Sequence, residues 1–132
     1  MDLSFIKENK LMAVVRGSNP EKVVKLGQAL YEGGVKIIEI TAETPKVMKL
    51  IEIVKEELSG KMYIGVGTVL DPETARNAIL AGADFVVSPT LNLETIKMTK
   101  RYGKISIPGA MTPTEILTAY EAGADAVKVF PS

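Results

Sequence analysis

The stretch "EAGADAVKVFP" (121–131), with its near-copy "LAGADFVVSP" (80–89), decides the fold. Each passes from a helix end, through glycine, into a short apolar strand, and "EGGVKIIEI" (32–40) follows the same course. Strand–helix units repeated with short loops imply parallel strands joined by right-handed crossovers. The sequence therefore predicts an α/β fold, either a TIM-type barrel or an open doubly wound sheet.

Short apolar runs rich in β-branched residues predict six strands. They span 11–16, 35–41, 62–68, 84–89, 104–111 and 125–131. Between them apolar residues recur at helical spacing, as in "PKVMKLIEIVKEELSG" (45–60), which gives five helices. A closed TIM-type barrel has eight strands and eight helices. We therefore expect residues 1–132 to form a single barrel domain that lacks the last two βα units.

Polar residues directly before prolines predict where four helices begin, because their side chains can cap the first turn. These residues are Asn19, Thr44, Asp71 and Thr112. "TPTE" (112–115) also fits a capping box. Glycines mark the expected helix ends. They are Gly60, Gly82, Gly103 and Gly123.

The composition narrows the possible functions. Lys plus Arg and Asp plus Glu each number 16, so the net charge is zero, and electrostatic binding to nucleic acid or an anionic membrane is not expected. The chain has no cysteine and no histidine, so acid–base chemistry must use Glu, Asp, Lys or Tyr. No signal peptide or stretch of roughly 18 apolar residues is present, so we expect a cytoplasmic protein.

Side chains alternate along a strand, and this alternation places two ionisable residues on one face of the sheet. Lys128 lies between Val127 and Val129, and Glu39 lies between Ile38 and Ile40. The aliphatic neighbours suit the face covered by helices. Lys128 and Glu39 then point to the other face, which in a barrel is the interior.

A lysine in such an interior would be desolvated, and its pKa should fall toward neutrality. A neutral amine can attack a ketone to form a Schiff base if an acid–base group lies nearby, and Glu39 is the natural candidate. The alternative is structural: Lys128 reaches solvent from a strand edge, and Glu39 pairs with it.

Other polar residues follow strands at their carboxyl ends, where barrel enzymes hold their chemistry. Arg16 and Thr68 are two of them, although Arg16 could cap a helix end and Thr68 could be an ordinary strand terminus. Gly65 and Gly67 in "GVGT" only weakly suggest phosphate binding, because the dinucleotide fingerprint is missing.

Six segments in order, "VVR", "GGVKIIEIT", "IGVGTVLDPETA", "AGADFVVSPTLN", "IPGAMTPTEI" and "AVKVFPS", resemble the 2-keto-3-deoxy-6-phosphogluconate (KDPG) / 4-hydroxy-2-oxoglutarate (KHG) aldolase family. The resemblance covers nearly the whole chain. It implies a (β/α)8 barrel that needs no metal or other cofactor and is usually a homotrimer. It also implies cleavage of a 2-keto-4-hydroxy acid to pyruvate and an aldehyde, glyceraldehyde 3-phosphate or glyoxylate, as in the Entner–Doudoroff route of carbohydrate metabolism.

The resemblance also assigns roles to residues. Lys128 of "KVFP" matches the Schiff-base lysine, and Glu39 of "IEIT" matches the proton shuttle. Thr68 would bind the pyruvyl portion, while Pro89 of "VSP" and Phe130 of "VFP" would wall the pocket.

Two departures from the family pattern are visible. Some members carry an arginine four residues after the strand glutamate, where it holds the pyruvate carboxylate, but this chain has Glu43 there. We hypothesise that Arg16 supplies the guanidinium instead. The family's phosphate-binding segment would lie beyond residue 132, so the sequence does not indicate whether the substrate is phosphorylated.

Two other functions remain open at this point. One is a phosphate-binding barrel isomerase or synthase in which Lys128 acts as an acid or base. The other is a catalytically silent barrel fragment that folds only by association.

Overall fold

The computed structural model describes residues 2–17 and 19–132. Its helices are α1 (Ser4–Asn9), α2 (Pro20–Glu32), α3 (Val47–Leu58), α4 (Pro72–Leu80), α5 (Leu93–Arg101) and α6 (Pro113–Glu121). Its strands are β1 (Ala13–Val15), β2 (Ile37–Thr41), β3 (Tyr63–Gly67), β4 (Phe85–Val87), β5 (Ile105–Ile107), β6 (Gly109–Ala110) and β7 (Lys128–Val129).

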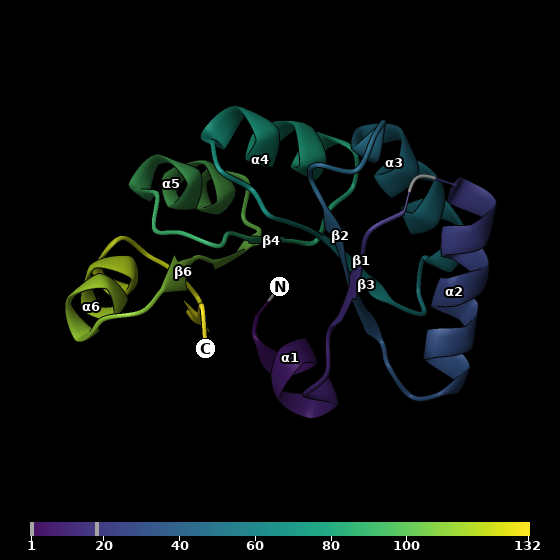
Figure 1. The fold of residues 1–132 in the computed structure, drawn as a ribbon, viewed down its shortest axis with the longest axis horizontal. Helices are drawn as coiled ribbons and strands as arrows, with labels where there is room; N and C mark the ends of the chain where they lie inside the picture. The colour runs from purple at the N-terminus through teal and green to yellow at the C-terminus, as the bar shows by residue number, and fades with distance from the viewer. Residues whose placement is uncertain (1, 18) are drawn as a thin grey trace.

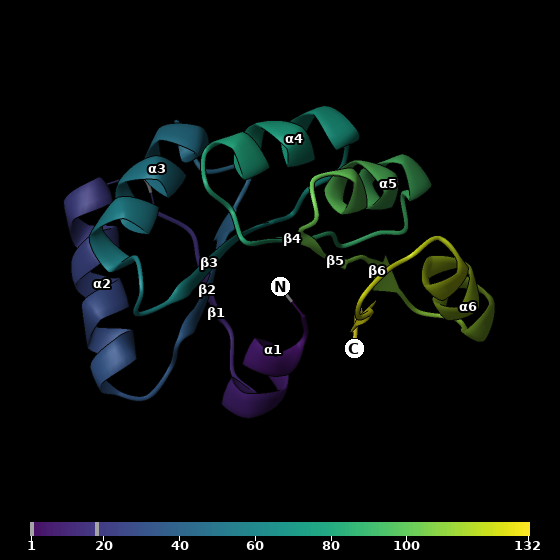
Figure 2. The ribbon, with the colours of Figure 1, turned by 180° about the vertical axis from the view of Figure 1, so that it is seen from behind.

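All strand pairs are parallel, as the repeated units predict. Strands β1 to β5 form one sheet in sequence order, and β6 pairs with β7 in a second, two-stranded sheet. Helices α2 to α6 form an arc outside the strands, and α1 lies in the open side of this arc (Figures 1 and 2). The parallel α/β fold is therefore confirmed.

The expected six strands and five helices differ from the observed elements in two places. The strand expected over 104–111 divides into β5 and β6 around Pro108, which has no amide hydrogen to give to a neighbouring strand. The amide of Gly109 instead donates to the Thr90 carbonyl, and β6 turns to pair with β7. The short helix α1 lies outside the five that were expected.

Three of the four predicted caps are confirmed. The side chains of Asn19, Asp71 and Thr112 each accept a hydrogen bond from the backbone amide three residues later. The Thr44 prediction is wrong: α3 begins at Val47, and the Thr44 hydroxyl instead lies 3.2 Å from that of Thr41.

Four helices end just before the glycines that predict their ends. Gly60, Gly82, Gly103 and Gly123 follow helix C-termini with positive φ, the backbone conformation that glycine adopts without strain. No helix formed by residues 2–17 and 19–132 is long and apolar enough to cross a bilayer.

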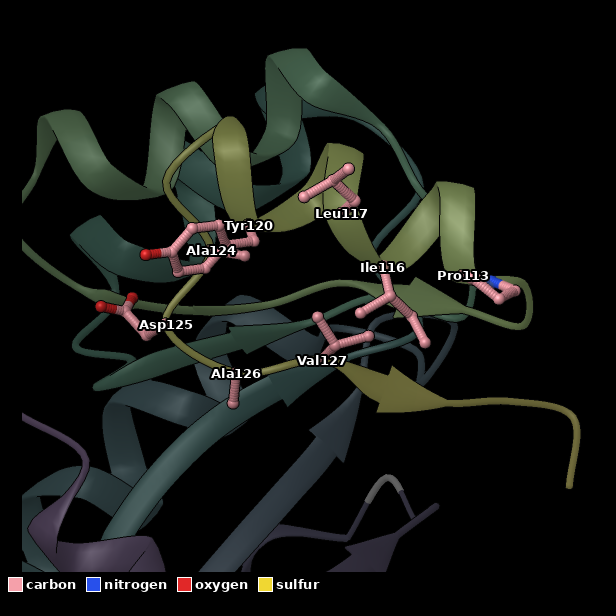
Figure 3. A pocket seen from close by; sticks show the side chains of 8 residues that line it. All are labelled: Pro113, Ile116, Leu117, Tyr120, Ala124, Asp125, Ala126 and Val127. Carbon is pink, nitrogen blue, oxygen red and sulfur yellow. The ribbon is translucent and has the colours of Figure 1, made fainter.

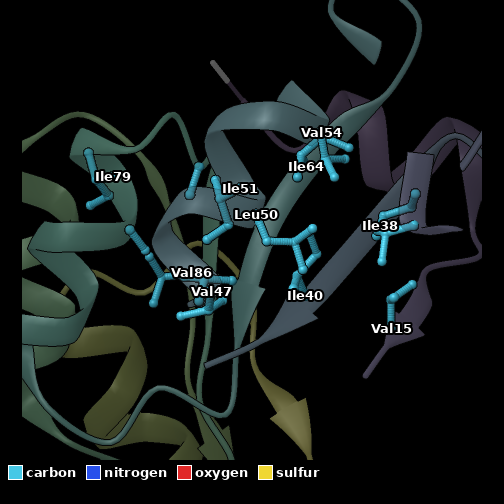
Figure 4. Close-up of a cluster of buried hydrophobic side chains, with 14 of the residues drawn as sticks. Val15, Ile38, Ile40, Val47, Leu50, Ile51, Val54, Ile64, Ile79 and Val86 are labelled. Carbon is cyan, nitrogen blue, oxygen red and sulfur yellow. The ribbon is translucent and has the colours of Figure 1, made fainter. Parts of the chain in front are cut away.

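The outer face of the sheet packs against the helices. This outer cluster gathers Val15, Ile38, Ile40, Ile64 and Val86 from the strands against the apolar side of α3 (Figure 4). The predicted alternation of β2 is therefore confirmed.

The inner face of the sheet holds a smaller cluster around Phe5 of α1. Its other buried members are Ile37, Phe85, Val87, Ile105 and Ile107. The Phe5 ring centroid lies 4.4 Å from that of Tyr63, the first residue of β3, and 5.8 Å from that of Phe85, the first residue of β4. Helix α1 thus covers the inner face at the amino ends of β3 and β4.

Candidate active site

Glu39 is a buried carboxylate on the inner face of β2, with only 4% of its surface exposed. In register, it stands between Val14 of β1 and Gly65 of β3. Its carboxylate lies over Gly67, where a Cβ atom would overlap the carboxylate oxygen. Gly65 likewise leaves room for the ring of Phe85. The glycines of "GVG" therefore provide space for inner-face side chains, which accounts for them without phosphate binding.

The surroundings of Glu39 perturb its proton affinity. Burial raises the pKa of Glu39 above its ordinary value of 4.5, because a desolvated carboxylate prefers to be neutral. The positive charges of Lys128 and Arg16 lower this pKa, and the negative charge of Glu43 raises it. The charges of Lys128, Arg16 and Glu43 therefore all act on the carboxyl group of Glu39.

Lys128 shares this inner side of the chain but is less enclosed than expected. Its side chain is half-buried, and its ammonium nitrogen lies 4.3 Å from the centre of the Phe130 ring. Within the described residues, β7 pairs with β6 alone, which leaves the other side of Lys128 uncovered. Lys128 is therefore half-buried, where the sequence predicts a desolvated amine. The contact between the ammonium and the aromatic face of Phe130 is a cation–π interaction.

Arg16 lies just beyond β1, and its Nε atom is 3.5 Å from a carboxylate oxygen of Glu43. Both side chains are more than half exposed, so this ion pair is weak and easily exchanged. Arg16 and Glu43 line a cavity of about 250 Å³ together with Gly17, Thr41, Thr44 and Pro45. Neither Lys128 nor Glu39 is among its lining residues. Arg16 instead acts on Glu39 through its charge, which lowers the pKa of Glu39.

Thr68 follows β3 with φ of 55°, in the left-handed region. A β-branched residue is rare there, and such conformations cost about 1–3 kcal/mol and concentrate at functional sites. Half-buried Pro89 follows β4, and its backbone lies against Gly109 of β6, where no Cβ would fit. The structure thus sets both residues at the carboxyl ends of their strands.

A larger cavity lies away from these residues. It has a volume of about 610 Å³, and apolar side chains of α6 and of the chain leading into β7 line it (Figure 3). Its lining includes Ala126 and Val127 but not Lys128 or Glu39. Lys128 and Glu39 therefore do not line the larger of these two cavities.

The sequence reasoning missed Gly67 as part of the site. The available signal was its spacing: Gly65 and Gly67 share a face in β3, beside the strand that carries Glu39. In a parallel pair, small residues on that face are where a neighbouring long side chain can lie.

Known proteins resemble the chain over nearly its whole length. A family model described as KDPG and KHG aldolase matches residues 3–132. The chain belongs to the KDPG and KHG aldolase family. Among its relatives, the 2-dehydro-3-deoxy-6-phosphogalactonate aldolase of Escherichia coli is 35% identical over 122 residues, which is 92% of this chain and 60% of that protein.

Other family members match the chain over a similar span. The 2-dehydro-3-deoxy-phosphogluconate aldolase of Treponema pallidum is 37% identical over 93% of this chain and 58% of its own length. The structure of the KDPG aldolase from Legionella pneumophila, with pyruvate captured as a covalent carbinolamine intermediate, matches with a TM-score of 0.84. It is 28% identical and covers 91% of this chain and 58% of that one. The chain spans about three fifths of the length of these relatives.

The fit of Glu39 over Gly67 predicts the effect of adding one methyl group. Gly67→Ala should lower the free energy of unfolding by about 1–3 kcal/mol, because the new Cβ and the carboxylate cannot both keep their places. On a Glu39→Ala background most of this cost should disappear. Urea unfolding of the four proteins in this double-mutant cycle measures the difference.

Gly33→Ala is the matched control, because Gly33 ends α2 with φ of −78° and its nearest crowding atom would lie 3.4 Å away. That change should cost within about 0.5 kcal/mol on either background. An equal cost of Gly67→Ala with and without the Glu39 carboxylate would contradict the described fit.

Proposed function

We propose that the chain carries the catalytic pair of a class I, Schiff-base aldolase, an aldehyde-lyase, that cleaves a 2-keto-4-hydroxy acid to pyruvate and an aldehyde. The observation that supports this most is the buried Glu39 carboxylate at the carboxyl-end half of the inner face, under the influence of the Lys128 charge. Family membership supports the same reading, as does the carbinolamine that pyruvate forms in the Legionella pneumophila relative.

In this proposal the amine of Lys128 attacks the C2 carbonyl of the keto acid and forms a carbinolamine, which loses water to give an iminium ion. Cleavage of the C3–C4 bond then sends its electron pair to the iminium nitrogen, so that a neutral enamine forms in place of a carbanion. The aldehyde leaves. Protonation at C3 and addition of water release pyruvate and restore the amine.

Glu39 serves as the acid and base of these steps. As an acid it protonates the departing hydroxyl of the carbinolamine, and as a base it removes the proton of the C4 hydroxyl during cleavage. The resulting acid then protonates the enamine carbon. A carboxyl group whose pKa is raised by burial suits both directions, because its two protonation states lie closer in free energy near neutral pH.

The remaining residues bind and shape the substrate in this proposal. Phe130, beside the amine, stabilises the positive charge of both the ammonium and the iminium forms. Thr68 holds the pyruvyl portion, Pro89 forms a wall of the pocket, and Arg16 binds the carboxylate once it exchanges Glu43 for the substrate.

We further propose that the chain supplies the first six strands of an eight-stranded barrel, with β5 and β6 counted as one strand. Its span of about three fifths of its relatives supports this proposal. The substrate, KDPG or KHG, and the trimeric assembly are proposals drawn from the family.

Reductive trapping tests the proposed nucleophile. Incubation with pyruvate and sodium cyanoborohydride should attach a reduced pyruvyl group to Lys128, which peptide mass spectrometry locates. Glu39→Gln should slow this by about 100-fold, because a positioned acid–base group contributes 10²–10⁴-fold.

Lys128→Met is the loss-of-function variant, and Lys97→Met is its matched control because Lys97 is an exposed lysine of α5. Adduct spread evenly over several lysines, or no adduct on protein that unfolds cooperatively, would overturn the proposal. The second result would favour an isomerase, a synthase or a silent fragment.

The proposed role of Arg16 gives a separate prediction. Arg16→Ala should raise the pyruvate concentration for half-maximal trapping about 10-fold, because a charge-assisted hydrogen bond contributes roughly 1.5–3 kcal/mol. Glu43→Gln should leave that concentration equal or lower, since it frees the guanidinium. Arg101→Ala, at the end of α5, is the control, and an unchanged half-maximal concentration in Arg16→Ala would refute the role.

A further inference from the structure

In each of the two "AGAD" repeats, one aspartate joins a lysine of a helix to the backbone of a strand, and we call this set of contacts a clamp. In the first repeat, Asp84 accepts hydrogen bonds from the ammonium of Lys55 at 2.5 Å and from the backbone amide of Ile64 at 3.0 Å. The amide of Asp84 donates in return to the carbonyl of Ile64 at 2.7 Å. Lys55 lies in the last turn of α3, and Ile64 lies in β3.

The second repeat reproduces this clamp with different residues. Asp125 accepts from the ammonium of Lys100 at 2.7 Å and from the amide of Ser106 at 2.8 Å. The amide of Asp125 donates to the carbonyl of Ser106 at 3.0 Å. Lys100 lies in the last turn of α5, and Ser106 is the second residue of β5, as Ile64 is of β3.

The repeat sets Lys128 in the position of Val87, because each is the third residue after its aspartate. An odd separation along an extended chain turns the aspartate and the third residue to opposite faces. Val87 belongs to the inner cluster. Figure 3 shows the alternation in the second repeat, where Val127 lies toward Ile116 of α6 and Ala126 points the opposite way.

The strands that follow the two aspartates differ in the number of neighbouring strands with which they pair. Strand β4, after Asp84, pairs with β3 on one side and with β5 on the other. Strand β7, after Asp125, pairs with β6 alone within the described residues. Beyond the clamp, backbone bonds of Lys128 to Pro108 at 2.8 Å and of Phe130 to Ala110 at 3.2 Å attach it. The Asp125 clamp therefore contributes more to holding β7 in place than the Asp84 clamp contributes to holding β4.

We propose that Asp125 and Lys100 are positioning residues for Lys128: their clamp ties the segment before β7 to β5, and thereby fixes the register of β7 on β6 and the direction of the reactive amine. The clamp lies on the helix side of the strand, so it never touches substrate. Its effect on catalysis rests on the proposed function, whereas its effect on the strand does not.

The test compares Asp125→Asn with Asp84→Asn, which alters the twin clamp where the third residue is Val87. Two quantities are measured on the full chain: hydrogen exchange of the Lys128 amide, and the rate of trapping of pyruvate at saturation. Asp125→Asn should speed exchange of this amide about 10-fold or more, as local opening becomes easier. It should also lower the saturated trapping rate by about 10- to 100-fold, because misplacement of a reacting group has effects of this size.

The control variant should behave differently. Asp84→Asn should leave both quantities within about twofold of the parent, because pairing on two sides still holds β4. The half-saturating pyruvate concentration should stay unchanged in Asp125→Asn, since Arg16 and Thr68 are untouched. A general loss of stability would alter both variants alike, so equal effects of the two substitutions, or no effect of Asp125→Asn, would overturn the proposal.

The lysine partners provide a second pair of variants in case Asp125→Asn does not fold. Lys100→Met keeps the bond between Asp125 and Ser106 and should shift both readouts in the same direction, while Lys100→Arg should restore them and Lys55→Met should leave them unchanged. If the parent forms no adduct with pyruvate, the proposed function fails. The exchange of the Lys128 amide then decides the positioning proposal alone.

Discussion

The burial of one carboxylate, that of Glu39, is the constraint on which the site depends. Its side chain can turn onto the inner face only because Gly67 in the neighbouring strand has no Cβ. Burial raises its pKa, and the charges of Lys128 and Arg16 oppose that effect. The rest of the fold serves this arrangement: α1 fills the amino end of the inner face, and the helices cover the outer face.

Much of the fold could be predicted from local patterns. The alternation of Ile38 and Ile40 with Glu39 fixed which face the carboxylate takes, and it needed only the period of a strand. The caps at Asn19, Asp71 and Thr112 followed from short-range geometry. The failures arose where another contact competes with the expected pattern, or where a proline interrupts it. Thr44 bonds to Thr41 and leaves α3 uncapped, and Pro108 divides a run that looks continuous.

The sequence proposed the residues of the candidate site but did not predict their surroundings. Alternation and family resemblance named Lys128 and Glu39, and the charge of Lys128 acts on Glu39. The half-buried state of Lys128 depends on how many strands flank β7, and its contact with Phe130 depends on side-chain packing. The local sequence predicts neither of these two features. The role of Gly67 and the twin clamps at Asp84 and Asp125 likewise emerge only when neighbouring strands are placed side by side.

The central claim is that Lys128 and Glu39 share one electrostatic site. A carbon-13 NMR titration of the Glu39 carboxyl group tests it most directly, in the parent chain and in Lys128→Met. The account predicts a pKa above 4.5 in the parent and a further rise in the variant, because removal of the lysine charge takes away an effect that lowers this pKa. An ordinary pKa in the parent, or the same pKa in both proteins, would contradict it.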